Sequence, residues 1–281
     1  MPAESTLATF TASDGENIAV QDWPLDDGVR QRGVVLVVHG LGEHAARHQR
    51  LAQKLNDWGF AVRGYDQYGH GESDGPRGGL PSEMRLVDDL ADVLESTRVR
   101  MARGAPLILL GHSMGGLVVA RFASLNRAPV DALVMSSPAL RTRLPRWKRV
   151  GLSALSGVAP NLVLPNGLDP DFLSHDPEVV RAYQHDRLCH DRISVRLARF
   201  IVEHGAATIA RAPQWRVPTL LMFAGRDHLV DPRGSRRFAA ATAGLEQVSA
   251  HCFDELYHEI FNEEDAEPVF EMLETWLQRF P

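Results

Sequence analysis

The sequence has 281 residues, of which 44% are hydrophobic and 23% charged, and this is the composition of an ordinary globular protein. The formal net charge of -6 gives no overall attraction to nucleic acid, so no nucleic-acid partner is expected. No run of about 18 apolar residues is free of charge, and the N-terminus lacks a basic segment followed by an apolar one. These features predict a soluble, cytoplasmic chain that forms one α/β domain with an insertion.

The predicted elements begin with two short strands at 7–11 and 17–23, which turn-forming residues join into an antiparallel hairpin. Apolar runs typical of strands buried on both faces follow at 34–38, 60–65, 107–110, 132–135, 219–223 and, more weakly, 246–253. Stretches with helical periodicity lie between them at 47–58, 82–102, 114–126, 233–243 and 262–279. This alternation predicts an α/β fold whose central sheet is mostly parallel and has helices on both faces.

The alternation breaks over residues 139–212, which carry helical patterns and many prolines but no convincing buried strand. We therefore expect a core made of residues 1–138 and 213–281, with residues 139–212 inserted as a helical cap. The sequence shows no internal repeat and no low-complexity tract.

A G-x-S-x-G motif places Ser113 between the strand predicted at 107–110 and the helix predicted at 114–126. In this strand-turn-helix setting the serine occupies a sharp, strained turn, and the flanking Gly111 and Gly115 lie where strand and helix leave no room for a side chain. The pattern favours a nucleophilic serine over the alternative, a glycine-rich turn that carries an ordinary surface serine.

A serine nucleophile needs a histidine base oriented by a carboxylate, in the chain order Ser, Asp or Glu, His for this arrangement. Asp227 follows the strand predicted at 219–223 and is preferred to Asp231, which precedes a proline and is expected to cap the next helix. His258 follows the last predicted strand and is preferred to His251, which lies within that strand.

Acyl transfer also needs two N–H donors for the developing oxyanion. The backbone N–H groups of Met114, directly after the nucleophile, and Leu41, after the strand predicted at 34–38, have the expected positions. The predicted reaction has two steps, in which Ser113 attacks an ester carbonyl and water then releases the acid.

Six segments taken in order resemble the monoacylglycerol lipase and lysophospholipase branch of the α/β hydrolases, also grouped as serine aminopeptidase-like hydrolases. They are HGLGEHAARH from His39, GYDQYGHGESDGPRG from Gly64, GHSMGG, SSPAL from Ser136, GRDHLVDP and ELYHEIFNE, within roughly residues 30–275. The resemblance implies the α/β-hydrolase fold and hydrolysis of a lipid ester, most simply monoacylglycerol to fatty acid and glycerol, without a cofactor.

Several related activities stay open at this point. A lysophospholipase, general carboxylesterase, thioesterase or aminopeptidase would use the same triad, whereas haloalkane dehalogenases and epoxide hydrolases place an aspartate at the position of Ser113. A binding protein that has lost its chemistry predicts a damaged triad, and all three members are present here.

The resemblance further implies an apolar tunnel for the acyl chain beneath a mobile cap and a polar pocket for glycerol near the serine. Glu43, Arg47, His112 and Tyr183 match substrate-binding positions in this family. The alternative for Glu43 and Arg47 is an ion pair at the start of a helix, and for Tyr183 a packing role.

The sequence predicts no metal site and no disulfide. His44 and His48 have the spacing of a zinc motif, but the glutamate of a metalloprotease is missing between them. Cys189 and Cys252 are far apart and are expected to be unpaired thiols in a reducing compartment.

The first half of the predicted cap combines basic and apolar residues. Two readings are equally compatible with this pattern: peripheral contact with a lipid surface, or a solvated basic face over a cap packed on its own domain. The sequence does not indicate an oligomeric state. The residues concerned are Arg141, Arg143, Arg146, Lys148 and Arg149, followed by Val150, Leu152, Leu155, Val158, Leu162, Val163 and Leu164.

Overall fold

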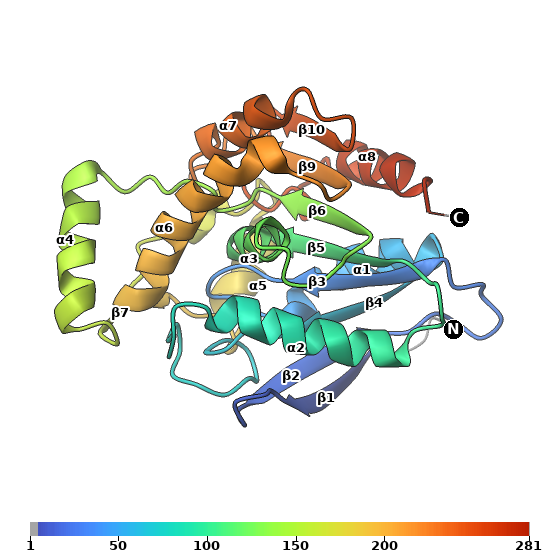
Figure 1. Ribbon diagram of the computed structural model, residues 1–281, viewed down its shortest axis with the longest axis horizontal. Helices are drawn as coiled ribbons and strands as arrows, with labels where there is room; N and C mark the ends of the chain where they lie inside the picture. The colour runs from blue at the N-terminus through green and yellow to red at the C-terminus, as the bar shows by residue number, and fades with distance from the viewer. Residues whose placement is uncertain (1–4, 281) are drawn as a thin grey trace.

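The computed structural model describes residues 5–280, apart from the side chain of Arg146. Its centre is an eight-stranded sheet with the strand order β1-β2-β4-β3-β5-β6-β9-β10 (Figure 1). The strands are β1 Thr6–Thr11, β2 Asn17–Trp23, β3 Gly33–Val38, β4 Phe60–Tyr65, β5 Leu107–His112, β6 Ala132–Ser136, β9 Thr219–Ala224 and β10 Val248–Phe253.

The first two strands form the expected antiparallel hairpin, and β2 also pairs antiparallel with β4. From β4 to β10 every neighbouring pair in this sheet is parallel. The carboxyl ends of these parallel strands therefore meet at one edge, where the sites of open α/β sheets lie. This confirms the mostly parallel sheet predicted from the sequence.

Alternation along each buried strand divides the core into two layers. In β3, Val34 and Leu36 pack into one hydrophobic cluster, whereas Val35 and Val37 pack into the other. Helices α2, α3 and α7 cover the first face, and α1 and α8 cover the second, as expected for helices on both faces. Their bounds are α1 Gln49–Asp57, α2 Arg85–Arg100, α3 Met114–Ser124, α7 Arg233–Thr242 and α8 Glu267–Leu277.

Helix boundaries lie within three residues of the prediction except at the start of α8. A 3-10 turn, η1 Ala45–His48, precedes α1, and α8 begins at Glu267, five residues after the predicted start at 262. Pro268 explains the second difference, because proline is tolerated in the first turn of a helix but not in its interior.

Between β6 and β9 the chain forms three helices, α4 Arg146–Val158, α5 Pro177–His185 and α6 Val195–Arg211, with short 3-10 turns at Pro170–Phe172 and Ala212–Gln214. Two three-residue strands, β7 Val163–Pro165 and β8 Arg192–Ser194, pair antiparallel, and only Ser194 among their residues is buried. They do not contradict the prediction of no buried strand, since they are too short to produce a strand period.

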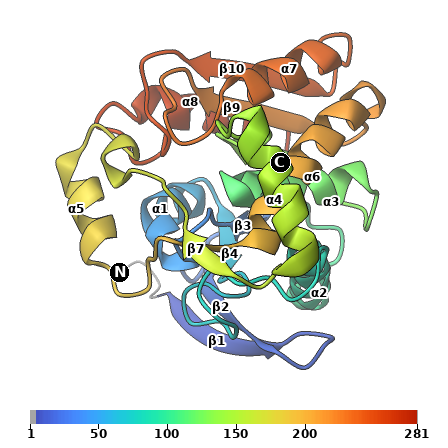
Figure 2. The same ribbon diagram turned by 90° about the vertical axis from the view of Figure 1, so that its left-hand side faces the viewer.

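Helices α4 and α6 are placed very differently. Leu197 and Phe200 of α6 are buried in the same hydrophobic cluster as α3, whereas α4 stands at the edge of the molecule and exposes Trp147, Val150 and Val158 (Figures 1 and 2). Among the described residues, no helix is both long and apolar enough to cross a membrane.

Candidate active site

Ser113 lies at the turn between β5 and α3, with φ 54° and ψ -117°. A non-glycine residue rarely adopts a positive φ, so the surrounding structure must hold it there. The two flanking glycines show how tight the turn is. A Cβ on Gly115 would overlap the backbone oxygen of Val38, and one on Gly111 would overlap the oxygen of Gly115. The turn therefore has the shape of a nucleophile elbow.

Asp227 and His258 come together at the carboxyl edge of the sheet, on the loops after β9 and β10. The Nδ1 atom of His258 lies 2.6 Å from Oδ2 of Asp227, and both side chains are buried. The other carboxylate oxygen accepts hydrogen bonds from the N–H groups of Leu229 and Val230, each at 2.9 Å. Asp227 is thus held in place and directs Nε2 of the imidazole away from itself.

The surroundings of His258 favour its protonated form. Burial by itself lowers the pKa of this imidazole, but the charge and hydrogen bond of Asp227 outweigh burial and raise the pKa above its ordinary value of 6.5. An imidazole of this kind accepts a proton readily, which suits a general base.

The alternative residues lie elsewhere. Asp231 is buried in ion pairs with Arg141 and Arg233, at 2.7 and 2.8 Å, directly before α7. His251 is exposed on the edge strand β10. The structure therefore brings Asp227 and His258 together and leaves both competitors out.

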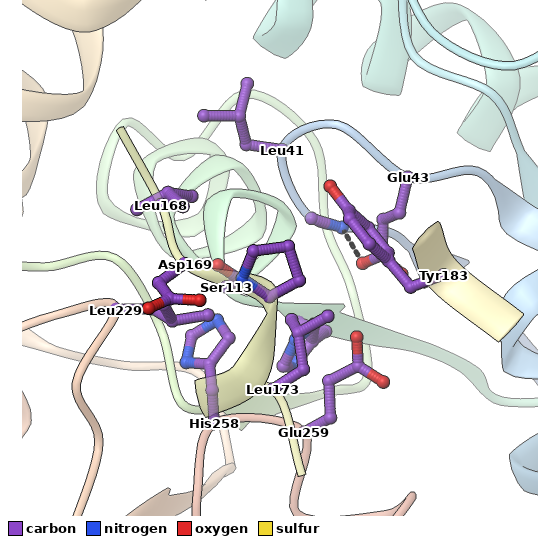
Figure 3. A pocket seen from close by; sticks show the side chains of 13 residues that line it. Leu41, Glu43, Ser113, Leu168, Asp169, Leu173, Tyr183, Leu229, His258 and Glu259 are labelled. Atoms are coloured by element: carbon purple, nitrogen blue, oxygen red, sulfur yellow. Dashed lines mark hydrogen bonds between the residues drawn. The ribbon is translucent and has the colours of Figure 1, made fainter. Parts of the chain in front are cut away.

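A pocket of about 400 Å³, including the part open to solvent, contains Ser113 and His258 (Figure 3). One wall comes from the loop after β3, and another comes from the segment inserted between β6 and β9. Thirteen residues line it: Gly40, Leu41, Glu43, His112, Ser113, Leu168, Asp169, Pro170, Leu173, Tyr183, Leu229, His258 and Glu259.

The two expected oxyanion donors come from different elements, and of the two only Leu41 lines the pocket. Met114 is the first residue of α3, so its N–H has no partner within the helix and lies at the positive end of the helix dipole. Leu41 lines the pocket from the loop after β3, and the N–H of Gly40 next to it donates to Oε1 of Glu43. Glu43 thereby fixes the backbone that carries Leu41.

Glu43, Arg47 and Glu259 form a buried ionic group beside the pocket. The guanidinium of Arg47 lies 2.8 Å from Glu259 and 3.3 Å from Glu43, and it packs 4.9 Å from the ring centre of Tyr183. Burial disfavours an ionised Glu43, but His48 and Arg47 outweigh burial and hold the pKa of Glu43 well below its usual range. Of the two residues assigned to the head group, Glu43 lines the pocket, and Arg47 reaches it through its two carboxylate partners.

His112 is buried directly beside the nucleophile. Its ring centre lies 4.8 Å from that of His258, and its Nδ1 lies 3.2 Å from Oγ of Ser136. Burial, followed by the charge of His258, lowers the pKa of His112 well below 6.5, so this ring stays neutral. Tyr183 is the fourth residue expected at the substrate site, and it lines the pocket from α5.

Sequence reasoning missed several lining residues. Glu259 directly follows His258 in a segment already recognised as a motif, so that signal was available. Asp169 and Leu173 flank a 3-10 turn inside the insertion, and no local pattern shows which residues of such a segment face the site.

Comparison with known proteins identifies the family of the chain. The family described as serine aminopeptidase, S33, matches residues 29–265. The chain belongs to this family. It is 32% identical to a monoacylglycerol lipase of Mycolicibacterium smegmatis over 273 residues, which cover 96% of this chain and 95% of that protein.

Two further comparisons concern the length and the fold of this family member. The chain is 27% identical over 98% of its length to an uncharacterised abhydrolase domain-containing protein of Dictyostelium discoideum, of which it spans only 29%. The crystal structure of a Paleococcus ferrophilus monoacylglycerol lipase superposes with a TM-score of 0.82 at 32% identity and covers 99% of this chain and 100% of that one. The fold is that of an α/β hydrolase, and the protein is a serine hydrolase of carboxylic esters.

Proposed function

We propose that this hydrolase cleaves monoacylglycerols into fatty acid and glycerol, with Ser113, His258 and Asp227 as its catalytic triad. The observation that carries the proposal is the buried Asp227–His258 pair, which shares one pocket with a serine on a strained elbow. The similarity to monoacylglycerol lipases supports the choice of ester.

In the proposed first step, Nε2 of His258 takes the proton of Ser113 as Oγ attacks the ester carbonyl. Asp227 keeps Nδ1 protonated and stabilises the imidazolium, while the N–H groups of Leu41 and Met114 bind the oxyanion. His258 then protonates the leaving glycerol. A water molecule activated by the same imidazole attacks the acyl-enzyme and frees the fatty acid.

The pocket offers a different surface to each half of such a substrate. Leu168, Leu173 and Leu229 suit the acyl chain, and Glu43 and Tyr183 provide oxygen atoms for glycerol hydroxyls, with His112 beside the serine. Arg47 supports this polar side by neutralising Glu43 and Glu259. In this proposal residues 139–212 act as the cap, because Asp169, Leu173 and Tyr183 all belong to them.

Peripheral contact with a lipid surface is part of the proposal and rests on α4. With 100° between successive residues, Trp147, Val150 and Val158 share one helix face, and they are 71%, 71% and 86% exposed. Lys148 provides positive charge on this exposed helix, whereas Arg141 and Arg143 contact Asp231 and the backbone oxygen of Asp227. The side chain of Arg146 lies outside the described part of the chain.

A substrate panel tests the proposal. Monoacylglycerols, lysophospholipids, p-nitrophenyl esters and amino-acid amides are compared by kcat/KM, and monoacylglycerols are expected to be the best substrates. A preference for lysophospholipids would reassign the head group, and hydrolysis of amides alone would contradict the proposal.

The variant Ser113→Ala tests the nucleophile in the same assay. Its kcat is expected to fall by on the order of 10⁶, the scale seen when a catalytic serine is removed from subtilisin. The control is Ser249→Ala, an exposed position on β10, which should retain full activity.

A further inference from the structure

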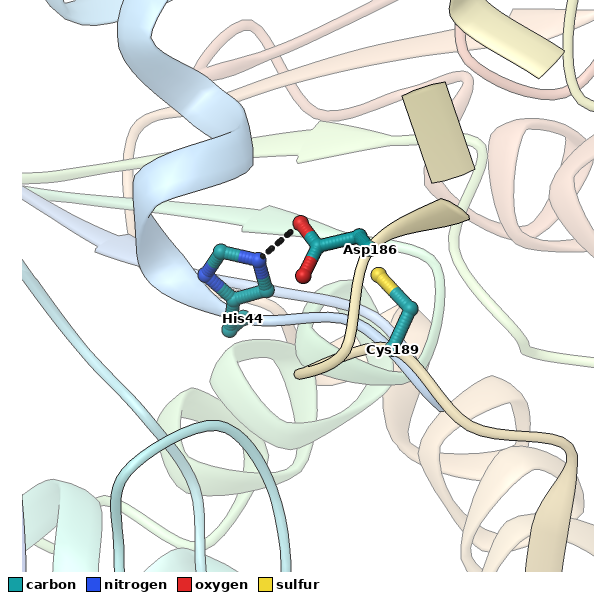
Figure 4. Close-up of side chains that lie close together, drawn as sticks. All are labelled: His44, Asp186 and Cys189. Carbon is teal, nitrogen blue, oxygen red and sulfur yellow. Dashed lines mark hydrogen bonds and ion pairs between the residues drawn. The ribbon is translucent and has the colours of Figure 1, made fainter. Parts of the chain in front are cut away.

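His44, Asp186 and Cys189 form a group of potential metal ligands outside the proposed triad (Figure 4). One ligand atom from each residue lies within 4.8 Å of the other two, and Nε2 of His44 is 2.8 Å from Oδ2 of Asp186. His44 comes from the loop after β3, whereas Asp186 and Cys189 follow α5. Two segments about 140 residues apart thus contribute to one cluster.

This combination of nitrogen, oxygen and sulfur ligands selects a class of ion. Thiolate and imidazole together suit Zn²⁺ and similar soft or borderline cations, whereas Mg²⁺ and Ca²⁺ prefer oxygen alone. With zinc bonds of about 2.0 Å to nitrogen and about 2.3 Å to sulfur, a tetrahedral ion needs ligand atoms roughly 3.5 Å apart. The three ligand atoms lie within 4.8 Å of one another, so they need to approach by at most about 1.3 Å. The Cys189 thiol has no hydrogen-bond partner among residues 5–280, whereas the 2.8 Å contact of His44 with Asp186 would open to admit the ion.

The charges around the cluster favour a cation. The carboxylates of Asp186, Glu43 and Glu259 all lie close enough to act on the Cys189 thiol, and the guanidinium of Arg47 opposes them. A bound ion would displace the thiol proton of Cys189 to solvent and take the thiolate as a ligand. Asp186 is 28% exposed, which leaves the cluster open to an ion from solution.

We propose that His44, Asp186 and Cys189 bind one Zn²⁺ or another thiophilic divalent cation, with solvent as a fourth ligand. This site differs from the pair His44 and His48 that the sequence excludes, because His48 lies against Glu43 instead.

Such an ion would join the cap to the loop that carries Leu41. The two segments already touch: the N–H of His190 donates to the oxygen of Gly42 at 2.9 Å, and the hydroxyl of Tyr183 lies 3.3 Å from the same oxygen. Metal coordination adds bonds between these segments that exist only in the folded chain. Bound metal should therefore raise the melting temperature.

Cadmium titration of the full chain tests the site, because a thiolate bound to Cd²⁺ gives a charge-transfer band in the ultraviolet. One Cd²⁺ per chain, with the band and a rise in melting temperature, is expected for the wild type. The variant Cys189→Ser should lose both, whereas Cys252→Ser, which removes the other free cysteine, should keep both. Equal bands in the two variants, or loss only in Cys252→Ser, would overturn the proposal.

Two further variants distinguish a three-residue site from a lone thiolate. His44→Gln and Asp186→Asn should each weaken the binding of Cd²⁺ and Zn²⁺ by about tenfold or more. Melting curves without metal show whether each variant folds. If both fold and bind as tightly as the wild type, Cys189 binds alone and the proposed site does not exist.

Discussion

His258 determines how the rate of this hydrolase depends on pH. Only the neutral imidazole accepts the serine proton, and Asp227 raises the pKa of His258 above 6.5, so kcat/KM should fall as the pH drops through that raised value. In Asp227→Asn the carboxylate charge is lost, but burial still lowers the pKa of His258. The acid limb of the pH profile should therefore move to lower pH, while kcat falls by about 10⁴.

The pH profile of kcat/KM measured for the two proteins checks this. Asp231→Asn serves as the control, because it removes a nearby buried carboxylate that pairs with arginines instead. The assignment of Asp227 would be wrong if the acid limb of the profile moved to lower pH in Asp231→Asn and stayed in place in Asp227→Asn.

Arg47 is expected to stabilise the fold more than an exposed arginine does. Replacing it with methionine leaves Glu43 and Glu259 buried without their shared guanidinium, and breaking a buried pair in this way costs about 3–5 kcal/mol. Urea unfolding measures the loss. The matched control is Arg181→Met, whose ion pair with Glu178 is largely exposed, and it should change the free energy of unfolding by less than about 1 kcal/mol.

The sequence identifies those site residues that follow a recognisable strand or motif. Asp227 and His258 could be chosen because each follows a predicted strand, and the carboxyl ends of parallel strands meet. Asp169 could not, because it lies in an irregular segment whose path depends on packing against the rest of the chain. Arg47 was assigned to the head group, but its contacts with two carboxylates become visible only in three dimensions.

The elbow between β5 and α3 depends on glycine for space. Gly115→Ala would push a Cβ into the oxygen of Val38, so it should lower the free energy of unfolding by about 1–3 kcal/mol and reduce activity by displacing Ser113. Gly151→Ala is the control, since this glycine lies inside exposed α4 with open space around it. There alanine should stabilise the protein by roughly 0.5–1 kcal/mol, because it favours the helix.

Denaturation curves and ester hydrolysis are measured for both variants. If Gly115→Ala and Gly151→Ala changed the free energy of unfolding equally, the turn at Ser113 would have space for a Cβ at residue 115.

Strands and helices were predictable wherever the hydrophobic period was long. The strands β3, β4, β5, β6 and β9 are buried on both faces, and each gives an apolar run that only Arg63 of β4 interrupts. The strands β7 and β8 have three residues each and give no such signal. The insertion was recognised as a break in the pattern, but the burial of α6 against α3 depends on tertiary contacts. Residues 139–212 therefore remain a predicted cap that is inserted in the core and is not an independent domain.

On the scale of the whole molecule, the exposed face of α4 provides the test of lipid contact. Replacing Val150 and Val158 together with serine removes apolar surface that would enter a membrane, so binding to anionic vesicles should weaken by roughly tenfold or more. Val99→Ser is the control, because Val99 is 79% exposed on α2. Vesicle sedimentation gives the comparison. Equal binding by the wild type, the double variant and Val99→Ser would exclude α4 as the surface that contacts lipid. The cytoplasmic location of the protein remains a prediction.

The position of β10 has a consequence for how activity is lost. This strand pairs on one side only, with β9, and three of its residues are exposed, yet the loop that carries His258 follows directly after it. Segments with few buried contacts open before the rest of a protein unfolds. Fraying of this edge would separate His258 from Ser113 while β5 and its neighbours stay intact. Amide hydrogen exchange should therefore be faster in β10 than in β5, and mild denaturant should abolish hydrolysis before the sheet melts.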